Sequence, residues 1–397
     1  MSRQRNDRQI ISHKEDYGDS KKRLAIAIIF LGMSFLIVFH AWGQTQKTPV
    51  ITRPHISFRV MEWNLENLFD IQHDTLKNDY EFLPDAIRHW NYNRYQKKLV
   101  DIARVITAVG EWTPPALVGL CEIENDSVLR DLTRRSPLKK LGYRYVVTHS
   151  PDQRGIDVAL LYQRDVFKLI SYQSITIPPF RQHRPTRDLL HVSGLLLTGD
   201  TLDVIVCHFP SRSGGAKESE PYRLHTAQIL QTAADSILFT RQHPQLIIMG
   251  DFNDYPTNKS IREVLSAQEP PINSVDTVTS NSSSAFSMPS ISPQKLYHLL
   301  ARKAKSRDFG SYKYHGEWGL LDHLIVSGTL LNKESNFYTS EEKAQVFRAP
   351  FLLTKDKKYG DDEPFRTYKG MKYQGGISDH LPIYSDFELI FDPETDY

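Results

Sequence analysis

Short apolar runs that end abruptly in polar residues recur along this chain, and they constrain its fold more than any other feature. In LIIMGDFNDYP (residues 246–256) the run stops at Gly250, and Asp251 and Asn253 follow two residues apart. Asp and Asn are also common in ordinary turns, so this stretch alone is open to a purely structural interpretation. Other runs end in polar residues in the same way: Asn64 with Glu66, Glu122, and His208.

The apolar runs themselves predict strands, because they are short and rich in β-branched residues. Many show no polar alternation, so we expect their sheets to be buried on both faces. Two longer segments have apolar residues at helical spacing: residues 93–109, and residues 222–242 with Ser219 and Pro221 as start signals. The expected strands cover residues 58–63, 116–121, 143–148, 158–162, 189–197, 202–207, 246–249, 324–326 and 382–388.

Two further polar clusters precede strands instead of following them. Asp322 and His323 come before strand 324–326, and Ser378-Asp379-His380 comes before strand 382–388. If these two strands run antiparallel to the others, their starts lie at the same edge as the other strands' ends. The sequence therefore predicts an α/β (α+β) fold with mixed sheets, in which all six clusters converge on one edge.

Oxygen-bearing side chains dominate this predicted edge. Glu122, Asp379 and Asn64 offer hard oxygen ligands, which suit Mg²⁺, with Mn²⁺ or Ca²⁺ as alternatives. A zinc site is disfavoured, because neither His208 nor His380 belongs to a spaced zinc motif. A hard cation beside several acids and two imidazoles suits the attack of water on a phosphate ester.

Seven stretches, in their order along the chain, resemble motifs of the endonuclease/exonuclease/phosphatase superfamily, the fold of deoxyribonuclease I. The resemblance covers residues 57–391 and is nearest to exported bacterial nuclease-like members. It implies a four-layer sandwich of two packed mixed β-sheets flanked by helices. Each stretch alone is weak evidence, whereas seven in order are specific. They are WNLEN (63–67), LCEIEN (120–125), RGIDVALLY (154–162), VCHFPSR (206–212), MGDFND (249–254), LLDHLIVS (320–327) and GISDHLP (376–382).

The resemblance also implies catalytic roles. Asp251 orients or deprotonates the attacking water, Asn253 donates to the scissile phosphate, and Phe252 turns into the core. His380, paired with Asp322, contacts the phosphate. A second group of implied roles comprises His208 as the other imidazole with Asp157 as its acid partner, Glu122 as the principal metal ligand, and Asn64, Glu66 and Asp379 beside it.

Three further residues are candidates for substrate binding. Arg212 follows His208 in a glycine-containing loop and could touch a phosphate chain. Arg366 and Tyr368 either line the substrate groove or only pack the long loop 341–375. The inositol-phosphatase branch is disfavoured, because MGDFNDYP and LLDHLIV lack its tryptophan, arginine and cysteine signatures.

The N-terminus predicts export. Lys21-Lys22-Arg23 precedes the apolar residues 24–42, which can span a bilayer, and Ala41-Trp42-Gly43 offers a signal-peptidase site. Residues 1–43 are therefore expected to be a signal peptide or a membrane anchor, followed by a linker (44–56), the domain (57–391) and a tail (392–397). The product would be periplasmic, secreted or membrane-anchored, with membrane contact through this segment alone, and monomeric.

Charge limits the kind of substrate binding. The formal net charge is +2, and residues 1–23 contribute seven Lys/Arg and four Asp/Glu, or +3, which leaves −1 for the rest. A near-neutral body holds nucleic acid only through local contacts. The two cysteines, Cys121 and Cys207, lie in apolar runs and are expected to be buried and unpaired.

The expected function is an exported, divalent-metal-dependent phosphodiesterase, with an endonuclease acting on DNA or RNA favoured. A phosphatase or a phospholipid phosphodiesterase of the same fold, acting on a small phosphodiester or a lipid, is the first alternative. A catalytically dead binding protein on this scaffold is the second. The absence of a G-x-S-x-G turn and of a P-loop disfavours serine hydrolases and P-loop NTPases.

Overall fold

The structure is a computed structural model that describes residues 54–391, except 181–183 and 273–290. The expected leader, most of the expected linker and the C-terminal tail lie outside the described residues. Within the described ranges, no helix combines the length and the apolar character needed to cross a membrane.

The first sheet, sheet A, has the strand order β13-β19-β1-β2-β4-β3, with β14 also paired to β19. β1 and β2 are parallel, and the other neighbours are antiparallel. The first and last long strands of the domain are therefore direct neighbours. The strands are β1 (His55–Leu68), β2 (Leu117–Ile123), β3 (Arg144–Val147), β4 (Asp157–Tyr162), β13 (Phe337–Tyr338), β14 (Ala344–Val346) and β19 (Ile383–Ile390).

The second sheet, sheet B, has the order β5-β6-β7-β8-β12-β9. Only β7 and β8 are parallel here, so this sheet is also mixed. Its strands are β5 (Phe167–Ile175), β6 (Leu189–Leu196), β7 (Thr201–His208), β8 (Gln245–Asp251), β9 (Leu296–His298) and β12 (Asp322–Ser327).

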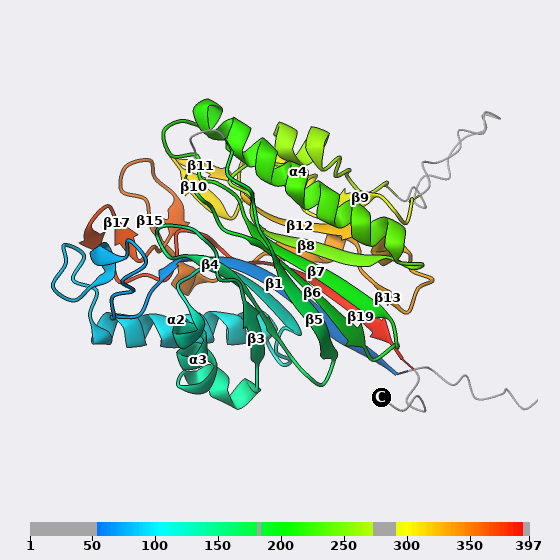
Figure 1. Cartoon of the computed structure of the whole chain (residues 1–397), viewed down its shortest axis with the longest axis horizontal. Coiled ribbons are helices and arrows are strands. Elements are labelled where there is room, and N and C mark those ends of the chain that lie inside the picture. Colours follow the sequence, from blue (N-terminus) through cyan, green and yellow to red (C-terminus); the bar gives the residue numbers. More distant parts are fainter. Residues whose placement is uncertain (1–53, 181–183, 273–290, 392–397) are drawn as a thin grey trace, which may run out of the picture. The chain divides into compact units, whose positions relative to one another are not determined.

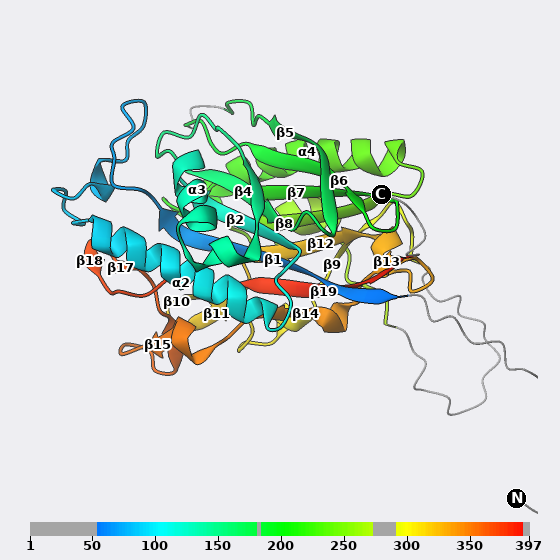
Figure 2. The ribbon, with the colours of Figure 1, turned by 90° about the horizontal axis from the view of Figure 1, so that it is seen from below.

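The two sheets pack face to face, and helices cover their outer faces (Figure 1). Helices α2 (Tyr92–Gly110) and α3 (Asp126–Arg134) lie on sheet A, as Figure 2 shows from below, and α4 (Ala216–Thr240) lies on sheet B. One apolar cluster fills the space between the sheets, a second lies under α2 and α3, and a third lies under α4. The four-layer, deoxyribonuclease I-like sandwich predicted from the sequence is confirmed.

Shorter elements fill the connections. Hairpins are formed by β10 (Tyr312–Tyr314) with β11 (Glu317–Gly319), β15 (Leu353–Lys355) with β16 (Asp362–Pro364), and β17 (Tyr368–Lys369) with β18 (Lys372–Tyr373). Short helical turns lie at Tyr80–Phe82, Pro137–Leu141, Ser260–Val264, Lys303–Lys305, Gly328–Leu331, Glu341–Lys343 and Pro350–Leu352.

Every strand expected from an apolar run is present, but one helix prediction needs correction and one helix was missed. α4 begins at Ala216, so Pro221 lies inside the helix and not at its start. Side chains satisfy carbonyls in this first turn: Ser219 Oγ donates to Gly215 O at 2.6 Å, and Arg223 Nη2 donates to Ala216 O at 2.7 Å. Helix α3, capped by the side chain of Asn125, was not predicted.

The strand directions bring the polar clusters to one end of the molecule, as predicted. In sheet B, Asp251 pairs with His208 of parallel β7 and with Asp322 of antiparallel β12. In sheet A, β19 runs antiparallel to β1, so its start lies beside the end of β1. We call this end the catalytic rim; it lies at the left in Figure 1.

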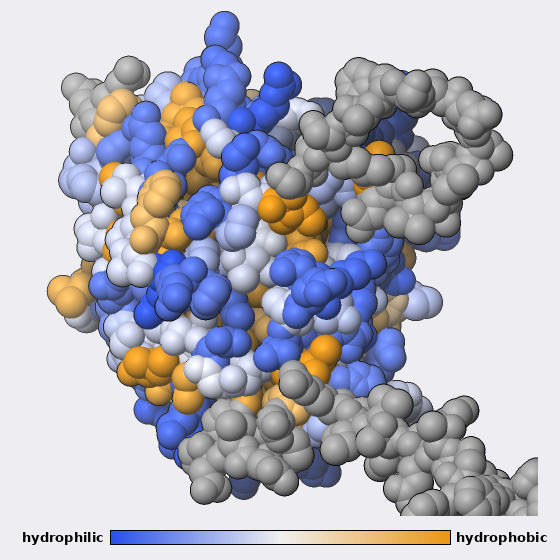
Figure 3. All heavy atoms as spheres, turned by 90° about the vertical axis from the view of Figure 1, so that its right-hand side faces the viewer, coloured by the Kyte–Doolittle hydropathy of each residue, from blue (hydrophilic) through white to orange (hydrophobic). Residues whose placement is uncertain are grey.

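The opposite end of the molecule has an ordinary mixed surface. Figure 3 shows that, outside the parts drawn in grey, apolar residues on this face lie in small groups between hydrophilic ones.

Candidate active site

The backbone at the rim adopts conformations that hold side chains at unusual angles. Gly250 has φ +150°, and a Cβ there would lie 1.9 Å from the carbonyl oxygen of Cys207 on β7, so only glycine fits. Glu66, Glu122 and Asn253 have φ of +49°, +63° and +50°, a left-handed region that non-glycine residues rarely occupy. Strain of this kind concentrates at functional sites.

Asp251 is the central carboxylate. Its Oδ1 accepts from the backbone N–H of Asn253 at 2.8 Å, and its Oδ2 accepts from Asn64 Nδ2 at 3.0 Å. The same Oδ2 lies 3.7 Å from His208 Nε2 and 3.9 Å from His380 Nε2. Burial raises the pKa of Asp251 to about 7, although the charge of His380 opposes that rise. Asp251 therefore lies between two imidazoles and, with Asn64, links sheet B to sheet A.

His380 forms an acid–imidazole pair with Asp322. Nδ1 of His380 donates to Asp322 Oδ2 at 2.7 Å, and the hydroxyl of Ser311 donates to the same oxygen. Burial lowers the pKa of His380, but the carboxylates of Asp322 and Asp251 outweigh that effect and raise it well above its ordinary value. His380 is therefore a buried imidazolium. The ring of Tyr312, which the sequence did not single out, lies 4.9 Å from the His380 ring.

His208 is at the rim, but its predicted pairing with Asp157 is wrong. Asp157 Oδ1 accepts from Thr148 Oγ1 at 2.7 Å, from the backbone N–H of Ser150 at 2.8 Å and from the Ser150 hydroxyl. Nδ1 of His208 is buried without a hydrogen-bond partner among the described residues. Burial, and then the charges of Arg187 and Arg154, lower the pKa of His208 well below its ordinary value. His208 is thus a neutral imidazole, the opposite of His380.

Glu122 presents one carboxylate oxygen to the same space. Its Oε2 accepts from the backbone N–H of Asn67 at 2.8 Å. Its Oε1 lies 4.0 Å from His208 Nε2 and 3.9 Å from Nη2 of Arg154, another residue that the sequence did not single out. Glu122 from sheet A and Asp251 from sheet B therefore each place a carboxylate oxygen within 4.0 Å of His208 Nε2.

Glu66 and Asp379 are both engaged by the loop around Arg366. Glu66 accepts from the backbone N–H groups of Thr367 at 2.6 Å and Tyr368 at 3.0 Å. Arg366 Nη2 donates to Asp379 Oδ2 at 2.6 Å, and Arg366 Nε lies 3.6 Å from Glu66 Oε1. Burial, with the nearby charge of Asp379, raises the pKa of Glu66 to about 7. Glu66 thus anchors the loop, and Arg366 bridges the two acids.

Tyr368 does not face the rim, so its predicted role in substrate binding is wrong. It is almost fully buried, and its hydroxyl donates to the carbonyl of Arg88 at 3.0 Å. The guanidinium of Arg88 lies 5.0 Å from its ring. This residue packs the long loop 341–375 against the segment that precedes α2, the structural alternative that the sequence left open.

The turn after Asp251 is held from both sides. Asn253 Nδ2 donates to the carbonyl of Phe209 at 3.1 Å, and Arg212 lies over the ring of Tyr255 at 4.7 Å. Phe252 is fully buried and packs 4.5 Å from the Phe209 ring, which confirms that it turns into the core. The two cysteines are buried and unpaired, as expected.

Behind this turn lies a buried network of ion-pair and hydrogen-bond contacts that the sequence gave no reason to expect. Asp254 pairs with Arg223 Nε of α4 at 2.7 Å, and both side chains are buried. The backbone N–H of Leu300 donates to His298 Nδ1 at 3.0 Å, so Nε2 of His298 carries the proton and donates to His323 Nδ1. His323 Nε2 then donates to the carbonyl of Asp254 at 2.8 Å. His323 is thereby a neutral structural residue beside Asp322.

The rim has the donors to hold a metal ion. One ligand atom from each of Asp251, Asp322 and His380 lies within 4.8 Å of the others, although the charged His380 would have to lose its Nε2 proton to become a ligand. Asp322 Oδ1 is buried and has no hydrogen-bond partner among the residues that the structure describes, and Oε1 of Glu122 faces the same region. Carboxylate oxygens of this kind fit a hard divalent cation better than a soft one.

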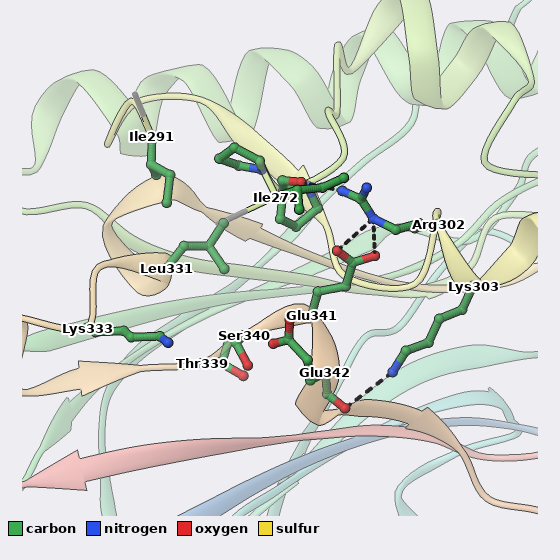
Figure 4. Close-up of a pocket in the computed structure, with 12 residues that line it drawn as sticks. Ile272, Ile291, Arg302, Lys303, Leu331, Lys333, Thr339, Ser340, Glu341 and Glu342 are labelled. Atoms are coloured by element: carbon green, nitrogen blue, oxygen red, sulfur yellow. Dashed lines mark hydrogen bonds and ion pairs between the residues drawn. The ribbon is translucent and has the colours of Figure 1, made fainter. Parts of the chain in front are cut away.

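Another cavity, of about 460 Å³, has a different character. Figure 4 shows it lined by Arg302, which binds the carboxylate of Glu341, together with Leu331, Ile272 and Lys333. None of the rim residues lines it, and its arginine is already paired. It therefore gives no reason to move the candidate site away from the rim.

Comparison with known proteins agrees with this fold. A family model described as Endonuclease/Exonuclease/phosphatase family matches residues 59–389, and no curated protein matches the sequence. The structure of an endonuclease/exonuclease/phosphatase family protein from Bacteroides thetaiotaomicron has 14% identity and a TM-score of 0.52, covering 86% of this chain and 100% of that one. The mannosyl-6-phosphatase of Bacteroides thetaiotaomicron VPI-5482 has 15% identity and a TM-score of 0.51, covering 83% and 99%. At these identities the likeness shows the fold.

Proposed function

The chain belongs to the endonuclease/exonuclease/phosphatase family, and from that premise we propose that it is an exported, Mg²⁺-dependent endonuclease that hydrolyses DNA or RNA. Its residues are those of a metal-dependent phosphoric ester hydrolase. The choice of a nucleic acid as substrate, the choice of metal and the export are the parts that we propose.

One observation carries the proposal: a carboxylate lies between a charged and a neutral imidazole. Asp251 Oδ2 is within 4 Å of both His380 Nε2 and His208 Nε2. An acid with a pKa near 7 can accept a proton from water at neutral pH. The imidazolium of His380 can donate to a phosphoryl oxygen on which negative charge develops. A site built only for binding has no need of opposite protonation states around one carboxylate.

The cation belongs near Glu122 in this proposal. Glu122 Oε1 is free of hydrogen bonds among the described residues, and Asn64 lies on the neighbouring strand of the same sheet. Asp251, Asp322 and His380 also form a candidate ligand group, but Asp322 and His380 already bind each other. When bound, a divalent cation would neutralise charge on the phosphoryl oxygens. Oδ2 of Asp379 is already bound by Arg366, so Asp379 would join the cation through its other carboxylate oxygen.

The remaining residues orient the substrate and the base. Asn64 holds Oδ2 of Asp251, and the backbone N–H of Asn253 holds Oδ1, so the carboxylate cannot rotate freely. Asp322, itself held by the Ser311 hydroxyl, binds Nδ1 of His380 and so fixes the ring. Nε2 of His380 then lies toward Asp251. Water that loses its proton to Asp251 would attack phosphorus, and the leaving oxygen would take a proton from solvent or from His380.

Basic side chains around the rim support a polyanionic substrate. Arg154 lies 3.9 Å from Glu122, Arg366 lies 2.6 Å from Asp379, and Arg212 follows His208 by four residues. They provide local contacts to a phosphate chain, which a body with a net charge near −1 requires.

Cleavage assays on the soluble chain from Gln44 onward test this function. That chain contains the whole compact unit Arg53–Tyr397. Supercoiled plasmid and structured RNA are incubated with it in Mg²⁺ or Mn²⁺, with and without chelator. We expect nicking that chelator abolishes and that Asp251→Asn and His208→Ala both reduce. Asp165→Asn, at an exposed aspartate beyond the other end of β4, serves as the charge-matched control.

Two other outcomes of these assays would contradict the proposed function. A folded chain that leaves both polymers intact but hydrolyses a sugar phosphate or a phospholipid would keep the chemistry and contradict the proposed substrate. No hydrolysis of any phosphate ester would favour a binding protein on this scaffold.

A further inference from the structure

A second cavity lies directly beside the catalytic rim. It has a volume of about 530 Å³, and its walls come from the loop after β3, the loop before β6, the loop after β7 and the start of α4. Three of its lining residues are arginines: Arg154, Arg184 and Arg187. We call it the arginine pocket.

The arginine pocket shares contacts with the active site. The carbonyl of Phe209 accepts from Arg187 Nη2 at 2.6 Å on the pocket side and from Asn253 Nδ2 at 3.1 Å on the rim side. Arg154, which lines the pocket, lies 3.9 Å from Oε1 of Glu122. The charges of Arg187 and Arg154 also act on His208. A molecule in the pocket would therefore be a near neighbour of the reacting phosphate.

Two buried donors in the pocket wall have no partner within the described residues. These are Nε of Arg187 and the hydroxyl of Thr186, and both side chains are more than nine-tenths buried. Leaving a buried polar group unsatisfied is costly, and native structures keep such groups where a ligand or water completes them. Nε of Arg187 can only donate, so it lacks a hydrogen-bond acceptor, and the Thr186 hydroxyl is able to donate as well.

The net charge of the lining residues indicates that the acceptor is an anion. The carboxylate of Asp152 neutralises part of Arg187 at 3.2 Å, and Glu218 also lines the cavity, so the three arginines leave an excess of one positive charge. Ser211, Ser213 and Gly214 complete the wall with small groups that give an anion access. Arginine is the residue best suited to bind a phosphate through several hydrogen bonds.

We propose that the arginine pocket binds a second phosphate of the substrate, next to the one that is cleaved. This inference rests on the proposed function and narrows it: the preferred substrate is a nucleic acid chain with at least two consecutive phosphates. A lone phosphodiester fills the rim but leaves Thr186 and Arg187 unsatisfied.

Short nucleotides test the subsite on the same soluble chain in Mg²⁺. The dinucleotide TpT carries one phosphodiester, whereas pTpT and TpTp each add one terminal phosphate on opposite sides. We expect kcat/KM for one of the two phosphorylated forms to exceed that for TpT by about tenfold or more, the usual gain from charge-assisted hydrogen bonds. Arg184→Gln and Thr186→Val should each lower this ratio toward one.

The control and the contrary outcomes are distinct. Arg144→Gln removes an exposed arginine at the far end of sheet A and should keep the ratio. Thr186→Val preserves side-chain shape, so it remains informative if Arg184→Gln unfolds. Equal kcat/KM for all three nucleotides in the wild type, or an unchanged ratio in both variants, would overturn the subsite alone. A folded wild type that nicks plasmid but cleaves none of the three would also overturn the subsite alone, because two consecutive phosphates would then not be enough for cleavage. A folded wild type that cleaves neither these nucleotides nor the plasmid nor the RNA would overturn the proposed function and the subsite together.

Discussion

The two ends of sheet B treat a buried aspartate in opposite ways. Asp203, on β7 far from the rim, is bound by the hydroxyl of Ser193, by His191 Nε2 at 2.9 Å and by Arg241 Nε at 2.8 Å. Burial raises its pKa, but these hydrogen bonds outweigh burial and lower it to about 2. At the rim end of β8, burial prevails and raises the pKa of Asp251 to about 7.

The difference separates stability from function along the same strands. At the far end, ionised Asp203 has its cation beside it, and the arrangement stabilises the fold. At the rim, Asp251 is buried with amide and imidazole neighbours, and nearby polar atoms of His208 and Asp322 lack hydrogen-bond partners within the described part of the chain. The rim is therefore the less satisfied end, as expected for a functional site.

The largest expected effect is on catalysis at the rim. Asp251→Asn removes the base and should lower kcat by about a thousandfold, within the usual range for general base catalysis. Because the substituted carboxyl is poorly stabilised in the fold, the melting temperature should not fall. Plasmid nicking rates and thermal melts measure both. A large loss of stability with activity retained would show that Asp251 serves the fold and not catalysis, the reverse of what we infer for the rim.

The next effect is on stability at the far end. Asp203→Asn leaves Arg241 without its carboxylate and should lower the free energy of unfolding by about 2 kcal/mol. Its kcat per folded molecule should match that of the wild type. Denaturant titration and initial rates at a temperature well below melting give the two quantities. A variant of unchanged stability would show that the far end is not the better satisfied one.

The two aspartates should also give pH dependences of opposite sign. The folded pKa of Asp251 lies above its ordinary value, so its contribution to stability is present below about pH 4 and lost as pH rises through 7. The folded pKa of Asp203 lies below its ordinary value, so its contribution is present above about pH 4 and lost as pH falls toward 2. Unfolding free energies in chelator, for wild type against Asp251→Asn and Asp203→Asn, would reveal these slopes.

The smallest effect concerns Tyr368. This residue lies near the rim, but its hydroxyl has a hydrogen-bond partner, as the carboxylate of Asp203 has at the far end. Tyr368→Phe removes one hydrogen bond to Arg88 and should lower the free energy of unfolding by about 1 kcal/mol. KM for nucleic acid should not change, because the side chain faces the loop interior. A KM increase of severalfold would return Tyr368 to the substrate groove.

The parts of the fold that the sequence predicts are those with local signals. Buried strands such as β8 appear as apolar runs, and the direction of β12 and β19 follows from where their polar residues stand. β5 was missed because it is an edge strand whose side chains are mostly exposed. Helix α3 is only nine residues long, and the start of α4 depends on side-chain bonds from Ser219 and Arg223 that no local rule anticipates.

The site was predictable by residue type but not by partner. Residues at strand ends, such as Asn64 and Asp251, were found because the strands deliver them. Whether Asp157 meets His208 or Thr148 depends on how two sheets and a loop are placed, which strand patterns do not specify. Arg187 and Tyr312 were missed because neither belongs to a strand expected from an apolar run, although the basic stretch RQHRPTRD (181–188) was a visible signal.

The pairing of β1 with β19 has a consequence for when the enzyme becomes active during synthesis. His55 pairs with Ile390, so the pairing of β1 with β19 is complete only after Ile390 has left the ribosome. His380 directly precedes β19, and it therefore joins Asn64 and Asp251 at the rim only when this strand has been made. Long-range pairing of this kind forms late in folding. An N-terminal fragment that ends before His380 lacks part of the proposed catalytic set, so we expect a half-translated product to be inactive.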